Sequence, residues 1–180
     1  FWFNRELTSP KIAVELENME LIKYFIDLYS QYNKPKSKSK SKSKKNKQNE
    51  NNNLYVDINA KTAEDRSALF IALKLKNREI LHELISCPLI DINEDSRERT
   101  FLCKVVKKMT RNNFGISFSY NEILDLALNR NDLDVNKPSR KYDDQTCLHV
   151  ACKSSNHNIR LVNKLLKIKG INVNAQSKEG

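Results

Sequence analysis

The seven residues from Thr146 to Cys152 read TCLHVAC, which places two cysteines and a histidine within a short stretch. A second histidine, His157, follows shortly after Cys152. Such a stretch permits three interpretations: a metal site, a reactive thiol with a base beside it, or a structural element of a repeated fold. The choice depends on whether other parts of the chain carry the same pattern.

A five-residue pattern occurs four times in the chain: any residue, an apolar residue, Asp or Asn, a β-branched residue, and Asn. The copies are Tyr55–Asn59, Leu89–Asn93, Asp132–Asn136 and Gly170–Asn174, and their final Asn residues lie 34, 43 and 38 positions apart. Recurrence over such distances is typical of a fold built from repeated supersecondary units. The Asp and Asn side chains predict turns in which they form hydrogen bonds with the local backbone.

Two further patterns lie in register with the first. A hydroxyl residue precedes a short apolar stretch in Thr8–Ala13, Ser67–Ala72, Thr100–Val105 and Thr146–Ala151. Thr or Ser in this position predicts an N-cap, and the stretch after it predicts a short buried helix. A second, amphipathic helix is predicted from the spacing of apolar residues in 20–26, 79–85, 122–128 and 160–166.

Together, these patterns resemble the ankyrin repeat family. Residues 146–151 match that family's T-P-L-H-x-A signature in all but the Pro, and residues 67–72 and 100–105 are weaker copies. The resemblance implies an all-α solenoid of stacked helix–turn–helix units joined by short hairpin-like loops, because one helix pair is too small to bury its own apolar face. The positions that match the structural motif are Thr8, Ala13, Ser67, Leu69, Ala72, Thr100, Leu102, Thr146, Leu148, His149, Ala151 and Gly170.

The predicted domain organisation follows the repeats. Repeat 1 covers 1–33, a low-complexity insert 34–53, repeat 2 54–90, a degenerate repeat 3 with an insert 91–133, repeat 4 134–171, and the start of repeat 5 172–180. The chain does not begin with Met, and we expect it to be a fragment.

The turn between the two helices departs from the family pattern, which usually has Gly in a left-handed conformation there. Glu17 and Lys76 stand at this position. A left-handed conformation would cost each of them about 1 kcal/mol. The neighbouring Asn18 and Asn77 are the alternative residues to adopt it.

The repeat interpretation accounts for TCLHVAC position by position. Thr146 is the cap, Leu148 and Ala151 are core, and the resemblance implies that His149 bonds to the loop backbone and to the capping Thr. Cys152 is expected to be a small buried side chain. The spacing C-x-H-x2-C-x4-H differs from that of structural zinc sites, and no pattern supplies a group to orient a catalytic base. We therefore predict no metal site, no cofactor and no catalytic residue.

Most of the net charge of +10 lies in one segment. Residues 34–53 hold eight Lys and one Glu in a run of Lys, Ser and Asn without apolar residues, and this insert is predicted to be disordered. We favour a solvated insertion without a role of its own, because no aromatic residue is interleaved for base stacking. The alternative is a tether for nucleic acid or anionic lipid through Lys34–Lys47.

Residues 111–120 form a second insert that carries Phe114, Phe118 and Tyr120. These aromatic residues form either a recognition patch or a cluster packed back against repeat 3, and we favour the packed cluster.

The remaining composition excludes several classes of protein. Neither GxGxxG nor GxxxxGK occurs, so the common nucleotide-binding fingerprints are absent. No apolar run reaches the roughly 18 residues that a membrane helix requires. The four cysteines lack paired spacing, which favours a reducing, intracellular compartment, either cytoplasmic or nuclear.

The resemblance implies a scaffold that binds another protein through the concave surface of the repeats. The alternative is a regulatory repeat region of a larger enzyme or membrane channel. Candidate contacts lie at the loop tips and at the ends of the first helices. They are Lys61, Glu64, Asp65, Asp95, Arg97, Arg99, Arg140, Lys141, Tyr142 and Asp143 at the tips, and Lys74, Leu75, Lys153 and Ser154 on the helices.

Overall fold

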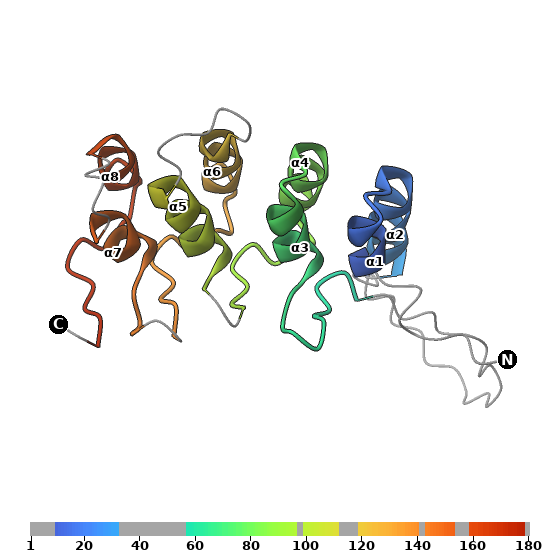
Figure 1. Cartoon of the computed structure of the whole chain (residues 1–180), viewed down its shortest axis with the longest axis horizontal. Coiled ribbons are helices and arrows are strands. Elements are labelled where there is room, and N and C mark those ends of the chain that lie inside the picture. Colours follow the sequence, from blue (N-terminus) through green and yellow to red (C-terminus); the bar gives the residue numbers. More distant parts are fainter. Residues whose placement is uncertain are drawn as a thin grey trace, which may run out of the picture.

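The computed structural model describes residues 10–32, 57–96, 99–111, 119–140, 143–153 and 159–178. These residues form eight α-helices and no β-strand, which confirms the all-α prediction. The helices are α1 (Pro10–Glu15), α2 (Met19–Tyr32), α3 (Ala68–Leu75), α4 (Arg78–Ser86), α5 (Phe101–Arg111), α6 (Tyr120–Leu128), α7 (Cys147–Cys152) and α8 (Ile159–Leu166). They pair along the chain, and the four pairs stand in a row in Figure 1, with α1–α2 at one end and α7–α8 at the other.

The first helix of each pair is short and largely buried. In α3 all residues from Ala68 to Leu73 are buried, and the Ser67 hydroxyl accepts a hydrogen bond from the Phe70 N–H at 3.4 Å. Ala13 and Ala72 are completely buried where α1 packs on α3, since their small side chains let the two backbones approach. The same pattern holds in the later first helices. The predicted motif positions in and directly before α3, α5 and α7 are buried as well: Leu69, Thr100, Leu102, Thr146, Leu148 and Ala151.

The second helix of each pair is amphipathic, as predicted. In α4 the residues Ile80, Leu81, Leu84 and Ile85 are buried, whereas Glu79, His82 and Ser86 on the opposite side are exposed. The buried side of α4 packs on α3 within its own pair and on α6 of the next pair. The helix α4 therefore belongs to interfaces both within its pair and between pairs.

Contacts between pairs complete the core. The rings of Phe70 in α3 and Phe101 in α5 meet edge to face, with centroids 6.0 Å apart and planes at 89°. This geometry is favourable for aromatic pairs because the positive ring edge faces the negative ring face. Further along the row, α5 packs on α7. The apolar residues of one pair are thus covered by the next.

The turns inside the first two pairs adopt the left-handed conformation at a charged residue. Glu17 has φ 52° and Lys76 has φ 59°. The neighbouring Asn residues have a different role, because the side chain of Asn18 accepts from the Leu21 N–H at 2.9 Å and that of Asn77 accepts from the Ile80 N–H at 3.0 Å. The Asn side chains cap the second helices, and the strain falls on Glu17 and Lys76.

The recurring Asp/Asn motifs form the predicted turns. In each copy an Oδ1 atom accepts a hydrogen bond from the N–H two residues later. The pairs are Asp57 and Asn59 at 3.0 Å, Asp91 and Asn93 at 2.9 Å, Asp134 and Asn136 at 2.9 Å, and Asn172 and Asn174 at 3.0 Å. This local bond leaves the side chain of the final Asn available for another contact.

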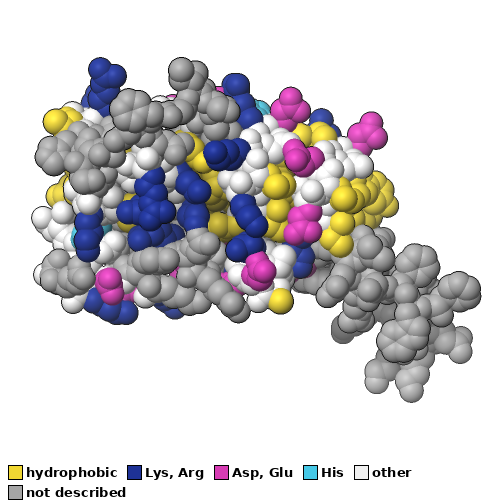
Figure 2. Space-filling view, viewed as in Figure 1, with side chains coloured by type: hydrophobic (Ala, Val, Ile, Leu, Met, Phe, Trp, Pro, Cys, Tyr) yellow, Lys and Arg dark blue, Asp and Glu magenta, His cyan; other side chains and the backbone are white. Residues whose placement is uncertain are grey.

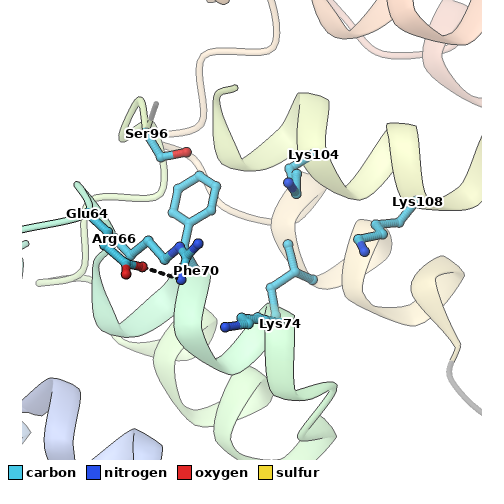
Figure 3. Close-up of a pocket in the computed structure, with 8 residues that line it drawn as sticks. Glu64, Arg66, Phe70, Lys74, Ser96, Lys104 and Lys108 are labelled. Carbon is cyan, nitrogen blue, oxygen red and sulfur yellow. Dashed lines mark ion pairs between the residues drawn. The ribbon is translucent and has the colours of Figure 1, made fainter. Parts of the chain in front are cut away.

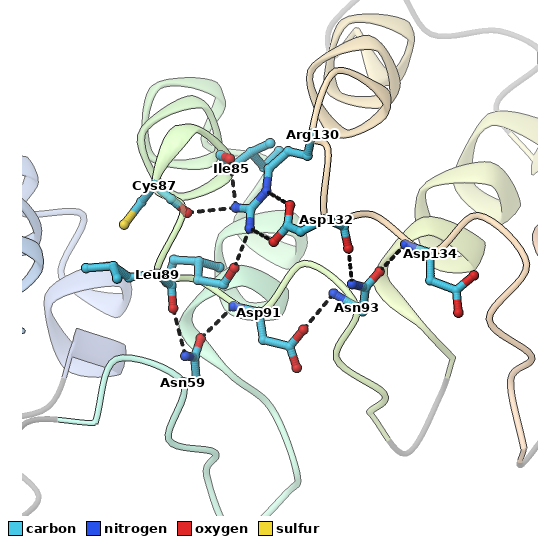
Figure 4. Close-up of polar contacts among 10 residues, drawn as sticks. Asn59, Ile85, Cys87, Leu89, Asp91, Asn93, Arg130, Asp132 and Asp134 are labelled. Atoms are coloured by element: carbon cyan, nitrogen blue, oxygen red, sulfur yellow. Dashed lines mark hydrogen bonds and ion pairs between the residues drawn. The ribbon is translucent and has the colours of Figure 1, made fainter. Parts of the chain in front are cut away.

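The final Asn of each motif connects one repeat to the next (Figure 4). Asn59 donates its amide to the Leu89 carbonyl and accepts from the Asp91 N–H, both at 2.9 Å. Asn93 bonds in the same way to Asp132 and Asp134, at 2.6 and 2.7 Å. Asn136 bonds to the carbonyl of Gly170, which has φ 84°, and to Asn172, both at 2.8 Å. One amide thus satisfies a donor and an acceptor on the neighbouring backbone at each junction.

Arg130 reinforces the junction between the second and third pairs (Figure 4). Its guanidinium donates to the carbonyls of Ile85 at 3.1 Å, Cys87 at 2.7 Å and Ile90 at 2.8 Å. The same group forms an ion pair with Asp132, and the Arg130 side chain is only 8% exposed. The hydrogen bonds from Arg130 hold the pKa of the Asp132 carboxyl below its usual range. The planar guanidinium reaches several acceptors at once, which a lysine ammonium cannot do.

We predict that Arg130→Ala lowers the free energy of unfolding by roughly 3 kcal/mol, because three carbonyls lose a charged donor. Arg130→Lys should recover part of this loss. Urea denaturation of the variants measures both values.

The matched control is Arg78→Ala, which removes an exposed ion pair of 2.6 Å with Glu122 that joins α4 to α6. This change should cost no more than about 1 kcal/mol. Equal losses in Arg130→Ala and Arg78→Ala would contradict the role given to Arg130.

Candidate binding surface

The loops between pairs form hairpin-like tips that project from the row of helices (Figure 1). Isolated bridges close two of them, between Asp95 and Thr100 and between Ser139 and Gln145. The tip before α3 is closed by the Thr62 N–H, which donates to the Arg66 carbonyl at 2.8 Å. The hairpin-like form predicted for these loops is therefore present.

Several predicted contact residues at the tips also bond within or between the tips. Lys61 forms an ion pair of 3.4 Å with Asp65, and its ammonium donates to the carbonyl of Asp95 in the next tip. The Asp143 carbonyl accepts from the Lys178 N–H at 2.8 Å. Asp65 and Asp143 both have positive φ, of 63° and 54°. These residues shape the tips, and Glu64 forms an ion pair of 2.6 Å with Arg66, whereas Arg140 is exposed.

The predicted contacts on the first helices are exposed. Lys74 and Leu75 lie at the end of α3, with Leu75 41% exposed, and Lys153 follows α7 directly. Lys74 borders a pocket of about 410 Å³ between α3 and α5. The pocket is shown in Figure 3 and is lined by Glu64, Arg66, Phe70, Leu73, Lys74, Ser96, Lys104 and Lys108.

The contribution of α5 to this pocket was not among the predictions from the sequence. Lys104, Lys107, Lys108 and Arg111 recur at helical spacing on the side of α5 opposite its buried residues. That spacing is visible in the sequence and would have indicated a cationic helix face.

Electrostatic repulsion connects these cations. Burial lowers the pKa of Lys104, and the positive charges of Lys108, Arg111 and Arg66 lower it further. Burial likewise lowers the pKa of Lys107, together with the charges of Arg111, Arg99 and Lys153. Since Arg66 precedes α3 and Lys153 follows α7, the positive potential extends across three helix pairs.

Some predicted residues lie outside the described part of the chain. Among the candidate contacts these are Arg97, Lys141, Tyr142 and Ser154, and among the structural positions Thr8. The predicted insert 34–53 also lies outside it, as do Phe114 and Phe118. Tyr120 is described and is buried as the first residue of α6, so it does not contribute to an exposed aromatic patch.

The side chains of TCLHVAC occupy the ordinary positions of a repeat. The Nδ1 atom of His149 accepts from the Thr146 N–H at 3.2 Å and lies 2.8 Å from the Thr146 hydroxyl oxygen. This confirms the predicted contacts of His149 with the loop backbone and the capping residue. Because the N–H donates to Nδ1, this nitrogen carries no proton, and the ring proton is on Nε2.

The cysteines of this stretch differ in exposure. Cys147 is buried and donates its S–H to the Val135 carbonyl at 3.3 Å, and burial raises the pKa of its thiol, which disfavours the nucleophilic thiolate. Cys152 is exposed, so the prediction that it is buried was wrong. It is the last residue of α7, where the helix leaves the core. Among the described residues no three His, Cys, Asp or Glu side chains form a potential metal site, and His157 lies outside them.

Residues 143–178 match the family model of the ankyrin repeat. The matched segment contains α7, α8 and the complete TCLHVAC stretch. No curated protein and no solved structure matches the chain. None of the described helices combines the length and the apolar character needed to cross a membrane.

A buried acidic residue outside the matched ankyrin repeat was also missed. Glu94 is 5% exposed and accepts a hydrogen bond from the Ser67 hydroxyl, so it connects the cap of α3 to the next tip. Burial raises the pKa of the Glu94 carboxyl from 4.5 to about 7, although the hydrogen bond from Ser67 and the charge of Lys61 act in the opposite direction. The copies of the motif that end at Asn59 and Asn174 have Ala next, so the motif gave no signal for a carboxyl group.

For the ankyrin repeat signature, we predict that His149→Ala lowers the free energy of unfolding by about 1 kcal/mol, because the Thr146 N–H loses its acceptor. Hydrogen exchange of the Thr146 amide should accelerate in the same variant. The control is His82→Ala on exposed α4 surface, which should leave both quantities unchanged. Unchanged exchange at Thr146 would contradict the role of His149.

For Glu94, we predict a pH-dependent stability that Glu94→Gln removes. The folded protein holds the proton up to about pH 7, whereas the ordinary pKa is 4.5. The stabilisation is therefore complete below pH 4.5 and is lost as the pH rises through 7, by roughly 3 kcal/mol in total. Urea denaturation of the native chain and Glu94→Gln between pH 5 and 8 measures the difference.

Glu64→Gln, at an exposed tip, is the control and should keep the native pH dependence. A native pH dependence in Glu94→Gln would contradict the prediction.

Proposed function

We propose that this chain is an ankyrin-like solenoid that binds a partner protein through the first-helix face, defined as the exposed residues of α3, α5 and α7 and of the loop tips. The pocket between α3 and α5 is the observation that carries the proposal. It lies next to the predicted contacts Lys74 and Leu75, which are exposed. Stacked repeats of this type present an extended surface for recognition.

The proposal assigns recognition to this face and no chemical step. The first-helix face offers charge, exposed side chains and a pocket with apolar side chains in its lining, which are the ingredients of a protein interface. The matched ankyrin repeat supports a binding role, because proteins of this family bind other proteins through their repeats.

We also propose an intracellular setting. All four cysteines are free, and Cys87, Cys103 and Cys147 are buried as thiols. Burial raises the pKa of the Cys103 thiol, as it does that of Cys147. Free buried thiols are typical of proteins that fold in a reducing compartment.

The proposed interface can be tested by site-specific photo-cross-linking in cells that naturally express the chain. A benzoylphenylalanine residue at Lys74 or Arg140 would sit on the first-helix face, and one at Glu20 or Arg160 would sit on the exposed surface of a second helix. We expect discrete cross-linked products with other proteins from Lys74 and Arg140, identified by mass spectrometry. Equal products from the second-helix positions, or none from Lys74 and Arg140, would contradict the proposal.

A further inference from the structure

We propose that the first-helix face binds an acidic segment of its partner protein, with one apolar side chain of that segment in the pocket between α3 and α5. This inference rests on the proposed function and adds the chemistry of the partner. The surface concerned, called the cationic face below, consists of Arg66, Lys74, Lys104, Lys107, Lys108 and Arg111.

Among the described residues that line the pocket, cations outnumber carboxylates. Figure 2 shows Lys and Arg side chains gathered over the middle of the molecule, where α5 lies in Figure 1. Among the described residues that line the pocket, Glu64 is the only acidic one, and it forms an ion pair of 2.6 Å with Arg66 (Figure 3). Within the described ranges no carboxylate lies within 4.0 Å of the ammonium groups of Lys74 or Lys108. These two ammonium groups are available to the carboxylates of a partner.

The helix dipole accounts for only part of this arrangement. Lys74, Lys108 and Arg111 lie in last helical turns, where a cation is stabilised by the carbonyl ends of the helix. Lys104 lies near the beginning of α5, where a cation is disfavoured by the same dipole. Burial lowers the pKa of Lys104, and repulsion from Lys108, Arg111 and Arg66 lowers it further, so the neighbouring cations destabilise its charged form. An anionic partner would relieve that repulsion.

The pocket itself adds an apolar component. Phe70 and Leu73 are part of its lining, together with Lys74, Lys104 and Lys108, which Figure 3 labels along with Phe70. An extended acidic segment with one Leu, Met or Phe could therefore place carboxylates against the lysines and its apolar side chain against Phe70 and Leu73. Apolar anchors in pockets contribute most of the affinity in such interfaces, whereas surrounding charges direct association and specificity.

These features favour a protein segment over a nucleic acid. A single-stranded nucleic acid is usually held by aromatic faces on which its bases stack. Phe70, the aromatic residue that lines the pocket, is 6% exposed and packs edge to face with Phe101. It offers no free ring face to a base.

The test uses fluorescence anisotropy with a short fluorescein-labelled peptide rich in Asp and Glu with one central Leu. We expect Lys74→Glu with Lys108→Glu to weaken binding at least about tenfold. The milder pair Lys74→Gln with Lys108→Gln should weaken it less and avoids the cost of an anion at a helix C-terminus. The matched control is Lys167→Glu with Lys169→Glu, two exposed positions after α8 that produce the same change in net charge. The control should bind like the native chain.

Three outcomes overturn the inference. The first is no binding of the peptide to the native chain, and the second is an equal loss in the control and in Lys74→Glu with Lys108→Glu. The third is that a single-stranded DNA of the same charge binds more tightly than the peptide and that Lys74→Glu with Lys108→Glu weakens this binding. Replacing the central Leu of the peptide by Ser should also reduce affinity, and an unchanged affinity overturns the role of the pocket. If the peptide fails while cross-links from Lys74 persist, the partner is not acidic and the proposed function stands.

Discussion

A single helix pair cannot bury its own apolar residues, because these residues face the neighbouring pairs. The rest of the structure depends on this constraint. The helix α7 has 6 residues and α8 has 8, whereas an isolated helix in water is marginal below about 12 to 15 residues. In α3 the residues Ala68 to Leu73 are buried on all sides, so this helix needs α1, α4 and the third pair around it. The stability of each pair therefore resides in its contacts with the adjacent pairs.

Stacking alone would leave backbone groups of the connecting loops without partners. The fold satisfies them with side chains, because the described loops contain no sheet in which they could bond to each other. One Asn amide per motif does this at three successive junctions. Arg130 supplies further donors at the junction between the second and third pairs. The motifs that end at Asn93 and Asn136 are also the successive copies that lie furthest apart in the sequence. A side chain that bonds to backbone on a neighbouring repeat fixes the register of the stack as well as its stability.

The difference between local contacts and contacts between distant residues explains which features the sequence could predict. Helix faces, caps and turns depend on residues a few positions apart, and the patterns around Ser67, Asp91 and His149 identified them correctly. Arg130 and Glu94 act on groups more than 25 positions away and stand at positions where the other copies differ, so periodicity gave no indication of them. Cys152 was assigned to the core because a free Cys is usually a small buried side chain, but α7 ends at this residue and its thiol is exposed.

The cationic face was not predicted for a different reason. Its Lys and Arg residues recur at helical spacing in the sequence, but the helical core does not require cations at these positions. The buried residues of α5 are Phe101, Leu102, Cys103, Val105, Val106 and Thr110, and the cations lie on the other side of the helix. Neutral polar residues there would avoid the burial of charge and the repulsion that together lower the pKa of Lys104 and Lys107. A lowered lysine pKa means that the charged folded state is less stable than it would be with isolated lysines. Within the described ranges no carboxylate contacts Lys74 or Lys108, so in the proposed complex the negative charge of an acidic partner would offset this cost.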